Sequence, residues 1–244
     1  MRKQFSILNI PIDVVTMEDA VQIIDRFIMR KQPRIVVTAN AEMVMQAQSD
    51  EELCQIMRSS DLVLADGAGV VWASKNYGRP LPERVAGADL VNQIFRLATA
   101  KQYRIFLLGA APGVAELAAS KTEAAFKGII ICGVRDGYFT SEDDAATIAT
   151  IKAAKPDILL VGLGVPRQEK WLWRHRDLLN VPVCMGVGGV IDVLAGTVKR
   201  APLWMQKSGL EWTYRLIKQP WRIVRMLALP KFVVRVLMAG LDKK

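Results

Sequence analysis

Polar side chains that could do chemistry come directly after two short apolar runs of this sequence. Thr38 and Asn40 follow the first run, in the stretch TANAE (38–42), and Asp66 follows the second, in ADGAGV (65–70). A hydroxyl and an amide can hold a polar substrate, and a carboxylate between an apolar run and a glycine turn suits a general base. These positions therefore indicate a ligand site with acid–base chemistry.

The same residues also have structural explanations. Asp66 could be the N-cap of a helix that begins at Gly69, because a carboxylate accepts hydrogen bonds from the first N–H groups of a helix. Glu42 could do no more than cap the helix that follows it. The residues alone do not decide whether Asp66 is a general base or a helix N-cap.

Several common kinds of site find no support. His175 lies in WLWRHR (171–176) without a serine or cysteine nucleophile motif, so we expect it to pack or face solvent. The cysteines have no CxxC or CxxH spacing, which argues against a zinc site or a disulfide framework and indicates a reducing compartment. No DxD motif and no cluster of His, Asp and Glu with metal spacing occurs, so we expect neither a metal nor another cofactor.

Without a metal, a bound diphosphate needs arginine or backbone N–H groups as partners. Arg84, in PERVAG (82–87), and Arg167 are candidates, and a surface role is equally compatible with the sequence. No GxxxxGK[ST] motif and no complete GxGxxG motif is present. That argues against a nicotinamide-linked oxidoreductase without excluding it.

Alternating elements would position these residues. Seven apolar runs are separated by amphipathic stretches, and we expect strands at 5–10, 34–38, 61–65, 103–108, 129–133, 157–162 and 182–187. Such alternation predicts an α/β fold with a mostly parallel sheet and helices on both faces. Helix-start signals lie at Thr16 to Asp19 and at Ser49 to Glu52, and we expect the second to be a capping box.

Ligands of open α/β sheets bind beyond the carboxyl ends of the strands. Six of the seven runs are followed by glycine, polar residues or both. Glycine lets backbone N–H groups approach a phosphate closely, although turn chemistry alone also predicts glycine in any one loop. Together the loops favour a nucleotide-type pocket along one edge of the sheet.

The net charge of +9 is concentrated near the end of the chain. Residues 199–244 hold eleven Lys and Arg and two acids, which leaves 22 basic and 22 acidic residues in the rest. The same segment contains Trp204, Trp212 and Trp221, three of the six tryptophans. A basic segment with tryptophans indicates an anionic partner surface, either a membrane or a nucleic acid.

The strand pattern ends near residue 196. Residues 203–240 read as two or three amphipathic helices interrupted at Pro220 and Pro230, so we expect a core at 1–196 and a helical appendage at 197–244. A homo-oligomer is another way to cover the aromatic residues of this segment. No secretory signal and no spanning stretch of about 18 apolar residues is found, so we expect a cytoplasmic protein.

Seven stretches, in order along nearly the whole chain, resemble the WecG/TagA/CpsF glycosyltransferases. They are TANAE (38–42), ADGAGV (65–70), ERVAGADL (83–90), RDGYF (135–139), GLGVPRQEKW (162–171), GVGGVIDVLAGTVKRAP (186–202) and LEWTYRLIKQPWRIVRM (210–226). Taken together they are highly specific, although each one alone is weak.

The resemblance implies an inverting, metal-independent hexosyltransferase with a Rossmann-like core, peripheral on the inner face of the cell membrane. It would move a sugar from a UDP donor to a polyprenyl-diphosphate-linked acceptor. In the TagA branch, which the tail resembles most, ManNAc passes from UDP-ManNAc to GlcNAc-diphospho-undecaprenol in wall teichoic acid synthesis. UDP-ManNAcA, UDP-glucose and UDP-galactose remain alternative donors.

Residue roles follow from the same resemblance. Thr38 and Asp66 would be catalytic, with Asp66 as the base. Ala39 stands where the family usually has proline, between the functional side chains. The substrate-binding residues would be Asn40 and Gln168 at donor or acceptor, Arg84 at a phosphate or sugar, and Tyr138 and Asp192 at the nucleoside.

The appendage would supply Arg215, Arg222 and Arg225 to the lipid diphosphate. On one continuous helix these arginines and Lys218 would fall within about 80° of arc. A solvated basic face is the alternative. A non-catalytic nucleotide- or RNA-binding module is a more remote possibility, weakened by the lack of an RNA-binding motif.

Overall fold

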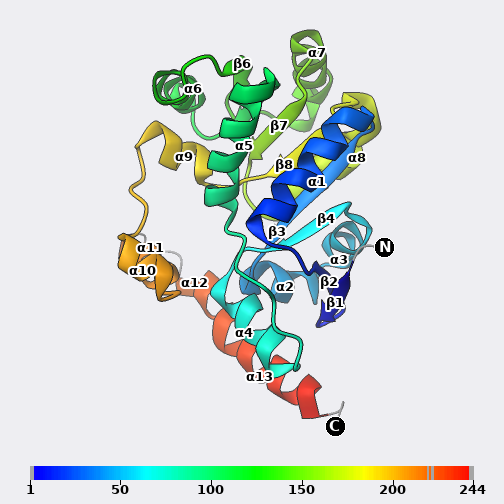
Figure 1. Ribbon diagram of the computed structural model, residues 1–244, viewed down its shortest axis with the longest axis vertical. Coiled ribbons are helices and arrows are strands. Elements are labelled where there is room, and N and C mark those ends of the chain that lie inside the picture. The colour runs from blue at the N-terminus through cyan, green and yellow to red at the C-terminus, as the bar shows by residue number, and fades with distance from the viewer. Residues whose placement is uncertain (1–2, 219, 221–222, 242–244) are drawn as a thin grey trace.

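The computed structural model describes the backbone of residues 3–218, 220 and 223–241. It describes their side chains except those of residues 207, 215, 224, 225, 240 and 241. The main sheet has six parallel strands in the order β4-β3-β8-β7-β5-β6 (Figure 1). These strands are β3 (Arg34–Ala39), β4 (Leu62–Ala65), β5 (Arg104–Gly109), β6 (Ile130–Arg135), β7 (Ile158–Gly162) and β8 (Val183–Gly186). The predicted α/β fold is therefore confirmed.

The expected strand at 5–10 is wrong. The chain instead forms an antiparallel hairpin of β1 (Gln4–Ile7) and β2 (Ile10–Asp13), outside the main sheet. Leu8 and Asn9 adopt positive φ values of 47° and 66°, which is the geometry of a two-residue hairpin turn. Asp13 ties this hairpin to β4, because its Oδ2 accepts a 2.7 Å hydrogen bond from the Val63 N–H.

Helices cover both faces of the sheet, as the alternation predicts. One face is covered by α1 (Met17–Arg30), α5 (Gly87–Lys101), α6 (Val114–Ala125) and α9 (Val190–Ala195). The other face is covered by α2 (Ala41–Ala47), α3 (Glu51–Ser59), α4 (Ala68–Asn76), α7 (Asp144–Ala154) and α8 (Arg167–Leu179), with the short η1 (Ser141–Asp143) before α7. The strands inside the sheet therefore bury side chains in both directions, which explains their nearly continuous apolar sequences, whereas the residues of the edge strand β6 are only half-buried.

Helix starts follow local side-chain chemistry. One capping box lies at α1, where Thr16 and Asp19 exchange hydrogen bonds with each other's backbone N–H, and another precedes η1. The expected box at Ser49 is wrong, because Asp50 is the N-cap of α3 and accepts from the Leu53 N–H at 3.1 Å. The Ser49 hydroxyl instead donates to the carbonyl of Gln46.

Within its described residues, the C-terminal segment contains four α-helices rather than two or three. They are α10 (Leu203–Lys207), α11 (Glu211–Lys218), α12 (Ile223–Met226) and α13 (Ala228–Leu241). Pro230 does not interrupt α13 but lies in its first turn, where a missing N–H is tolerated. In the described part of the chain no helix is long and apolar enough to cross a membrane.

Helix α13 packs against α2 and α4, below the carboxyl edge of the sheet (Figure 1). Its Phe232 and Val236 are buried in the same apolar cluster as residues of α2 and α4. The division into a core at 1–196 and an appendage at 197–244 stays a prediction. The packing of Phe232 and Val236 nevertheless places one side of α13 against the apolar interior.

Candidate active site

A cavity of about 610 Å³ opens at the carboxyl ends of β3 and β4. The turns after β3, β4 and β8 line it from one side, and the C-terminal segment lines it from the other. Its polar side chains are those of Thr38, Asn40, Glu42, Asp66, Arg84, Arg200 and Glu211. Its aromatic side chains are those of Trp72, Trp212 and Phe232. The sheet edge predicted to hold a ligand therefore has a cavity of ligand size.

Thr38 and Asp66 are brought together by parallel strand pairing. Ala39 pairs with Ala65, and the Asp66 N–H continues the ladder with a 2.9 Å hydrogen bond to the Ala39 carbonyl. Both side chains also adjoin Gly87. A methyl group there would lie 3.4 Å from Thr38 Oγ1, and the Gly87 N–H donates to Asp66 Oδ1 at 3.1 Å.

Asp66 does not cap the helix that follows it. The N-cap of α4 is Gly67, and the Asp66 carboxylate instead accepts from Gly87, the first residue of α5. The N-terminal N–H groups and dipole of a helix favour a negative charge at this position. The fold thus holds an oriented carboxylate in the cavity.

Asn40 both starts a helix and faces the cavity. Its Oδ1 caps α2 by accepting from the Met43 N–H at 2.9 Å. The amide NH2 is then the part of the side chain that can donate to a ligand. Glu42 lies in the first turn of α2 and is not its N-cap.

Two glycines of ADGAGV allow the starts of α2 and α4 to approach. A Cβ at Gly67 would lie 3.1 Å from Asn40 Cβ, and one at Gly69 would lie 3.0 Å from Ala41 Cβ. Both distances are tighter than ordinary contacts. These two glycines therefore have a packing reason, besides any role in binding a phosphate.

Sequence reasoning missed two charged residues of the cavity, Arg200 and Glu211. Arg200 forms a bidentate ion pair with Asp89 of α5, in which Nη1 and Nη2 donate to the two carboxylate oxygens. These hydrogen bonds raise the pKa of Arg200. Glu211 begins α11 and lies between two arginines, 3.6 Å from Arg200 Nε and 3.9 Å from Arg84 Nη2. Arg200 belongs to the stretch GTVKRAP (196–202), but no spacing rule marks one arginine there as facing a cavity.

Gln168 and Glu169 lie in the interior, and neither lines the cavity. Gln168 Oε1 accepts from the Gly164 and Gly188 N–H groups, so it ties the turns after β7 and β8 together. Its Nε2 donates to Glu169 Oε1 at 2.7 Å. Burial raises the pKa of Glu169 to about 7, and its Oε2 has no hydrogen-bond partner among the described residues. A direct substrate contact of Gln168 stays a prediction.

Tyr138 and Asp192 lie outside the cavity. Tyr138 follows β6, at the far edge of the sheet from β4, and is 76% exposed. Asp192 lies in the first turn of α9, whose Val190 and Val193 line the cavity. Their nucleoside roles stay predictions.

Two further expectations concern residues away from the cavity. Arg167 donates to the carbonyls of Gly137 and Phe139, so it holds the loop after β6 in place. His175 packs against Trp171 and pairs with Asp144 at 3.1 Å, in agreement with the expected packing role.

The three arginines expected at a lipid diphosphate are only partly described. Arg222 lies outside the described residues, and for Arg215 and Arg225 only the backbone, in α11 and α12, is described. Helix α11 ends at Lys218 and α12 begins at Ile223. The structure therefore does not describe the continuous helix that the predicted arc assumes.

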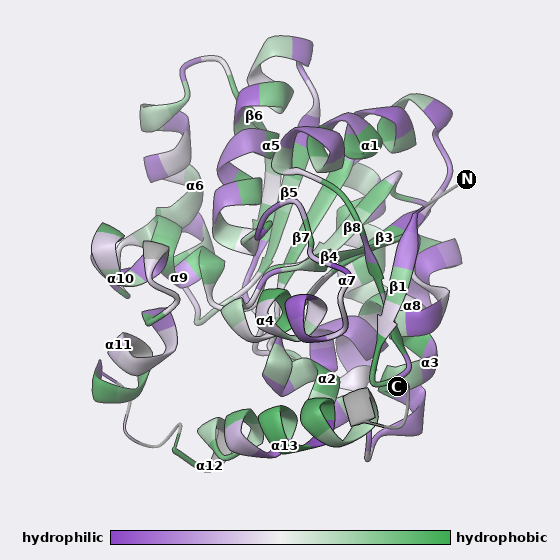
Figure 2. Ribbon diagram, turned by 60° about the horizontal axis from the view of Figure 1, so that its bottom comes forward, coloured by the Kyte–Doolittle hydropathy of each residue, from purple (hydrophilic) through white to green (hydrophobic). Residues whose placement is uncertain are grey.

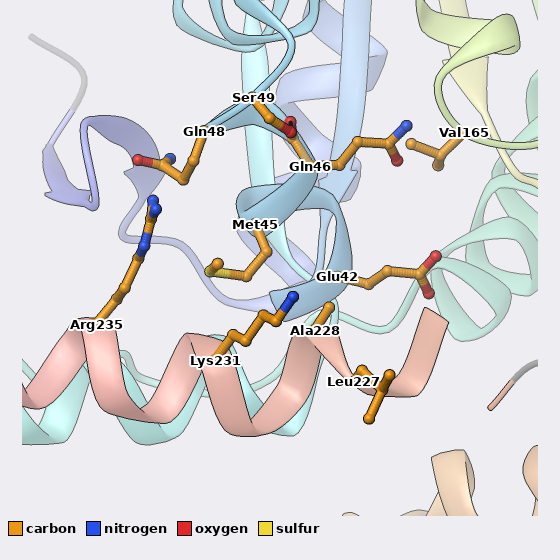
Figure 3. A pocket seen from close by; sticks show the side chains of 10 residues that line it. All are labelled: Glu42, Met45, Gln46, Gln48, Ser49, Val165, Leu227, Ala228, Lys231 and Arg235. Carbon is orange, nitrogen blue, oxygen red and sulfur yellow. Dashed lines mark hydrogen bonds between the residues drawn. The ribbon is translucent and has the colours of Figure 1, made fainter. Parts of the chain in front are cut away.

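A second hollow, of about 710 Å³, lies between α2 and α13 (Figure 3). Lys231 and Arg235 extend from α13 toward α2, which contributes Glu42 and Met45. Glu42 lines both hollows. Within the described ranges, no group of three His, Cys, Asp or Glu side chains is arranged to hold a metal ion.

Comparison with known proteins places this fold and cavity in a family. The profile of the family described as "Glycosyl transferase WecG/TagA/CpsF family" matches residues 5–244. Three relatives are named N-acetylglucosaminyldiphosphoundecaprenol N-acetyl-beta-D-mannosaminyltransferase. The one from Bacillus subtilis (strain 168) is 39% identical over 218 residues, 89% of this chain and 84% of the relative.

The relative from Bacillus spizizenii (strain ATCC 23059 / NRRL B-14472 / W23) is 40% identical over 202 residues, 83% of this chain and 78% of the relative. The one from Staphylococcus aureus (strain MW2) is 34% identical over 232 residues, 94% of this chain and 91% of the relative. The profile spans the whole sheet and the C-terminal helices, and the relatives match 83–94% of the chain. The chain therefore belongs to the WecG/TagA/CpsF family of glycosyltransferases.

Proposed function

We propose that this glycosyltransferase moves ManNAc from UDP-ManNAc to GlcNAc-diphospho-undecaprenol, a step in making the linkage unit of wall teichoic acid. The observation that carries the proposal is the cavity in which Thr38, Asn40, Asp66 and Arg84 meet. Three relatives named for this activity, at 34–40% identity, support the choice of donor and acceptor.

The proposed reaction is inverting and metal-independent. Asp66 takes the proton from the acceptor hydroxyl as its oxygen bonds to the anomeric carbon, and the bond from that carbon to UDP breaks. Thr38, beside Asp66, contacts the transferring sugar, and the Asn40 amide orients donor or acceptor. Arg84 compensates the negative charge that develops on the departing diphosphate.

The lipid-linked acceptor requires the cavity to work at a membrane surface. Much of α13 is coloured as hydrophobic in Figure 2. Helix α13 and the residue before it expose apolar side chains, with Leu227, Val234, Leu237 and Met238 each about half exposed or more. Lys231 and Arg235 lie on the same helix, so an anionic membrane surface offers both an apolar interior and opposite charge. We therefore propose peripheral binding to the inner membrane face through the C-terminal helices.

Release of UDP tests the reaction. Purified protein is mixed with UDP-ManNAc and a GlcNAc-diphospholipid, and Asp66→Asn is compared with wild type. Loss of the base should lower the rate by about 10²–10⁴-fold. Asp177→Asn is the matched control, because that side chain is 83% exposed and lies outside the cavity. An Asp66→Asn variant as fast as wild type contradicts the mechanism.

A donor panel tests the choice of sugar. UDP-ManNAc, UDP-ManNAcA, UDP-glucose and UDP-galactose are offered with the same acceptor, and UDP release is measured for each. We expect UDP-ManNAc to react fastest. Preference for another donor would keep the family assignment and move this chain to the synthesis of another cell-surface polysaccharide.

A further inference from the structure

Two arginines and one carboxylate meet at the wall of the cavity that contains Asp66. Glu211 Oε1 lies 3.6 Å from Arg200 Nε, and its Oε2 lies 3.9 Å from Arg84 Nη2. The three side chains are only 14–22% exposed. They come from separate segments, namely the loop before α5, the connection between α9 and α10, and the start of α11.

Glu211 compensates part of the positive charge of this arginine pair without accepting a hydrogen bond from either arginine. Both distances are too long for hydrogen bonds, so the contact is electrostatic only. The buried Nε of Arg200 has no hydrogen-bond partner among the described atoms. An unmet N–H in a buried guanidinium is unfavourable, so a ligand with more acceptor oxygens would bind here more strongly than one carboxylate.

The position of Arg200 is set independently of Glu211. Two nitrogens of its guanidinium bind the Asp89 carboxylate, which fixes the plane of the group and leaves Nε toward Glu211. The hydrogen bonds with Asp89 have the largest effect on the raised pKa of Arg200, and the charges of Glu211 and Asp66 raise it further. Arg200 is therefore a permanent, oriented cation near the proposed base.

We propose that Arg84 and Arg200 form a binding site for a diphosphate and that Glu211 is an internal counter-ion which the diphosphate displaces. The identity of that diphosphate rests on the proposed function, in which both the sugar nucleotide and the lipid acceptor contain one. Two guanidinium groups match the several charged oxygens of a diphosphate better than they match one carboxylate.

Displacement of Glu211 would also affect the position of helix α11. Glu211 is the first residue of α11, and the next residue, Trp212, lines the same cavity. A diphosphate that replaces Glu211 breaks the ion pairs of α11 with Arg84 and Arg200. Substrate binding is thereby coupled to the position of α11.

Binding of diphosphates to the full chain tests this inference without any turnover. Inorganic pyrophosphate, UDP and farnesyl diphosphate are titrated by calorimetry into wild type, Arg200→Gln and Glu211→Gln. Loss of one charged partner should weaken binding by about 10-fold or more in Arg200→Gln. Removal of the competing anion should tighten binding by about 3–10-fold in Glu211→Gln, on the scale of one partly buried charge. Arg174→Gln, with a 62% exposed side chain, is the control.

The outcomes separate this inference from the proposed function. If the variants change the affinity for UDP but not for farnesyl diphosphate, Arg84 and Arg200 bind the donor. If they change the affinity for farnesyl diphosphate but not for UDP, the two arginines bind the acceptor. Unchanged affinity of Glu211→Gln for all three probes overturns the inference even if Arg200→Gln fails to fold. The variants could change diphosphate binding although the protein releases no UDP from UDP-ManNAc. That result would support the diphosphate site and reject the proposed reaction.

Discussion

Hydrogen bonds at the ends of helices orient several single residues of this protein. Asp66 receives the first N–H of α5, and Asn40 gives its oxygen to the first turn of α2. Glu169 has different surroundings, because it is only 3% exposed and its Oε1 accepts a hydrogen bond from Gln168 Nε2. The same fold thus holds one carboxylate at a helix terminus and stores another in an apolar interior.

The raised pKa of Glu169 predicts a pH-dependent stability. Burial moves this pKa from 4.5 to about 7, so the folded protein holds the proton more tightly than the unfolded chain does. The stabilisation is fully present below about pH 4.5 and is lost as the pH rises to about 7. Above that pH the ionised group lowers the free energy of unfolding by about 3 kcal/mol at most.

Glu169→Gln checks this by urea unfolding at pH 5 and pH 8. The variant should gain stability relative to wild type at pH 8 and lose most of that gain at pH 5. Glu142→Gln, at an exposed position, should give no such change. A difference between Glu169→Gln and wild type that is the same at both pH values would show that burial does not control this carboxyl group.

At the scale of elements, the starts of α2, α4 and α5 converge on the cavity. Strand pairing of β3 with β4 sets Thr38 beside Asp66, and Gly67 lets the start of α4 approach Asn40. Gln168 then joins the turns after β7 and β8. The site is therefore built on the ends of rigid elements, which favours a fixed geometry.

Two substitutions at Asn40 separate its capping and binding roles. Asn40→Asp keeps an N-cap oxygen for the Met43 N–H and loses the amide donor, whereas Asn40→Ala loses both. We expect Asn40→Ala to unfold about 1 kcal/mol more easily, and Asn40→Asp to keep nearly the stability of wild type. Both should transfer sugar more slowly. Full activity of Asn40→Asp would limit Asn40 to its cap.

At the scale of the whole molecule, the C-terminal segment completes both the core and the cavity. Phe232 is 1% exposed and lies close to Gly69, while Met226, Leu229 and Val233 line the cavity. Removing residues after Gly196 would therefore take away one wall of the site. It would also uncover apolar surface on α2 and α4.

Phe232→Ala measures how far α13 belongs to the core. The loss of a fully buried ring should lower the free energy of unfolding by about 3–5 kcal/mol, as seen by urea denaturation. Val234 lies on the same helix and is 55% exposed. Val234→Ala should therefore change the free energy of unfolding by about 0.5 kcal/mol or less. Equal, small effects would mean that α13 is a separate appendage whose docking adds little to the stability of the body.

Most strands and the edge that carries the site could be predicted because their signals are local. An apolar run of four to six residues between helical stretches indicates a buried parallel strand wherever it lies, and six such runs are strands here. The hairpin at 4–13 escaped this rule, because its turn depends on positive φ values at Leu8 and Asn9. Local patterns predict which residues are buried, but they do not predict a chain reversal whose turn contains no glycine.

The sequence by itself determined the α/β alternation, the polar residues at the strand ends and the concentration of charge near the C-terminus. Only the tertiary structure decided that Thr38, Asn40, Asp66 and Arg84 share one cavity while Gln168 and Tyr138 do not line it. It also brought Arg200 beside Glu211 and α13 onto α2. The physical reason is that hydrophobic periodicity and helix capping are properties of near neighbours in the chain, whereas ion pairs and cavity walls depend on which distant segments pack together.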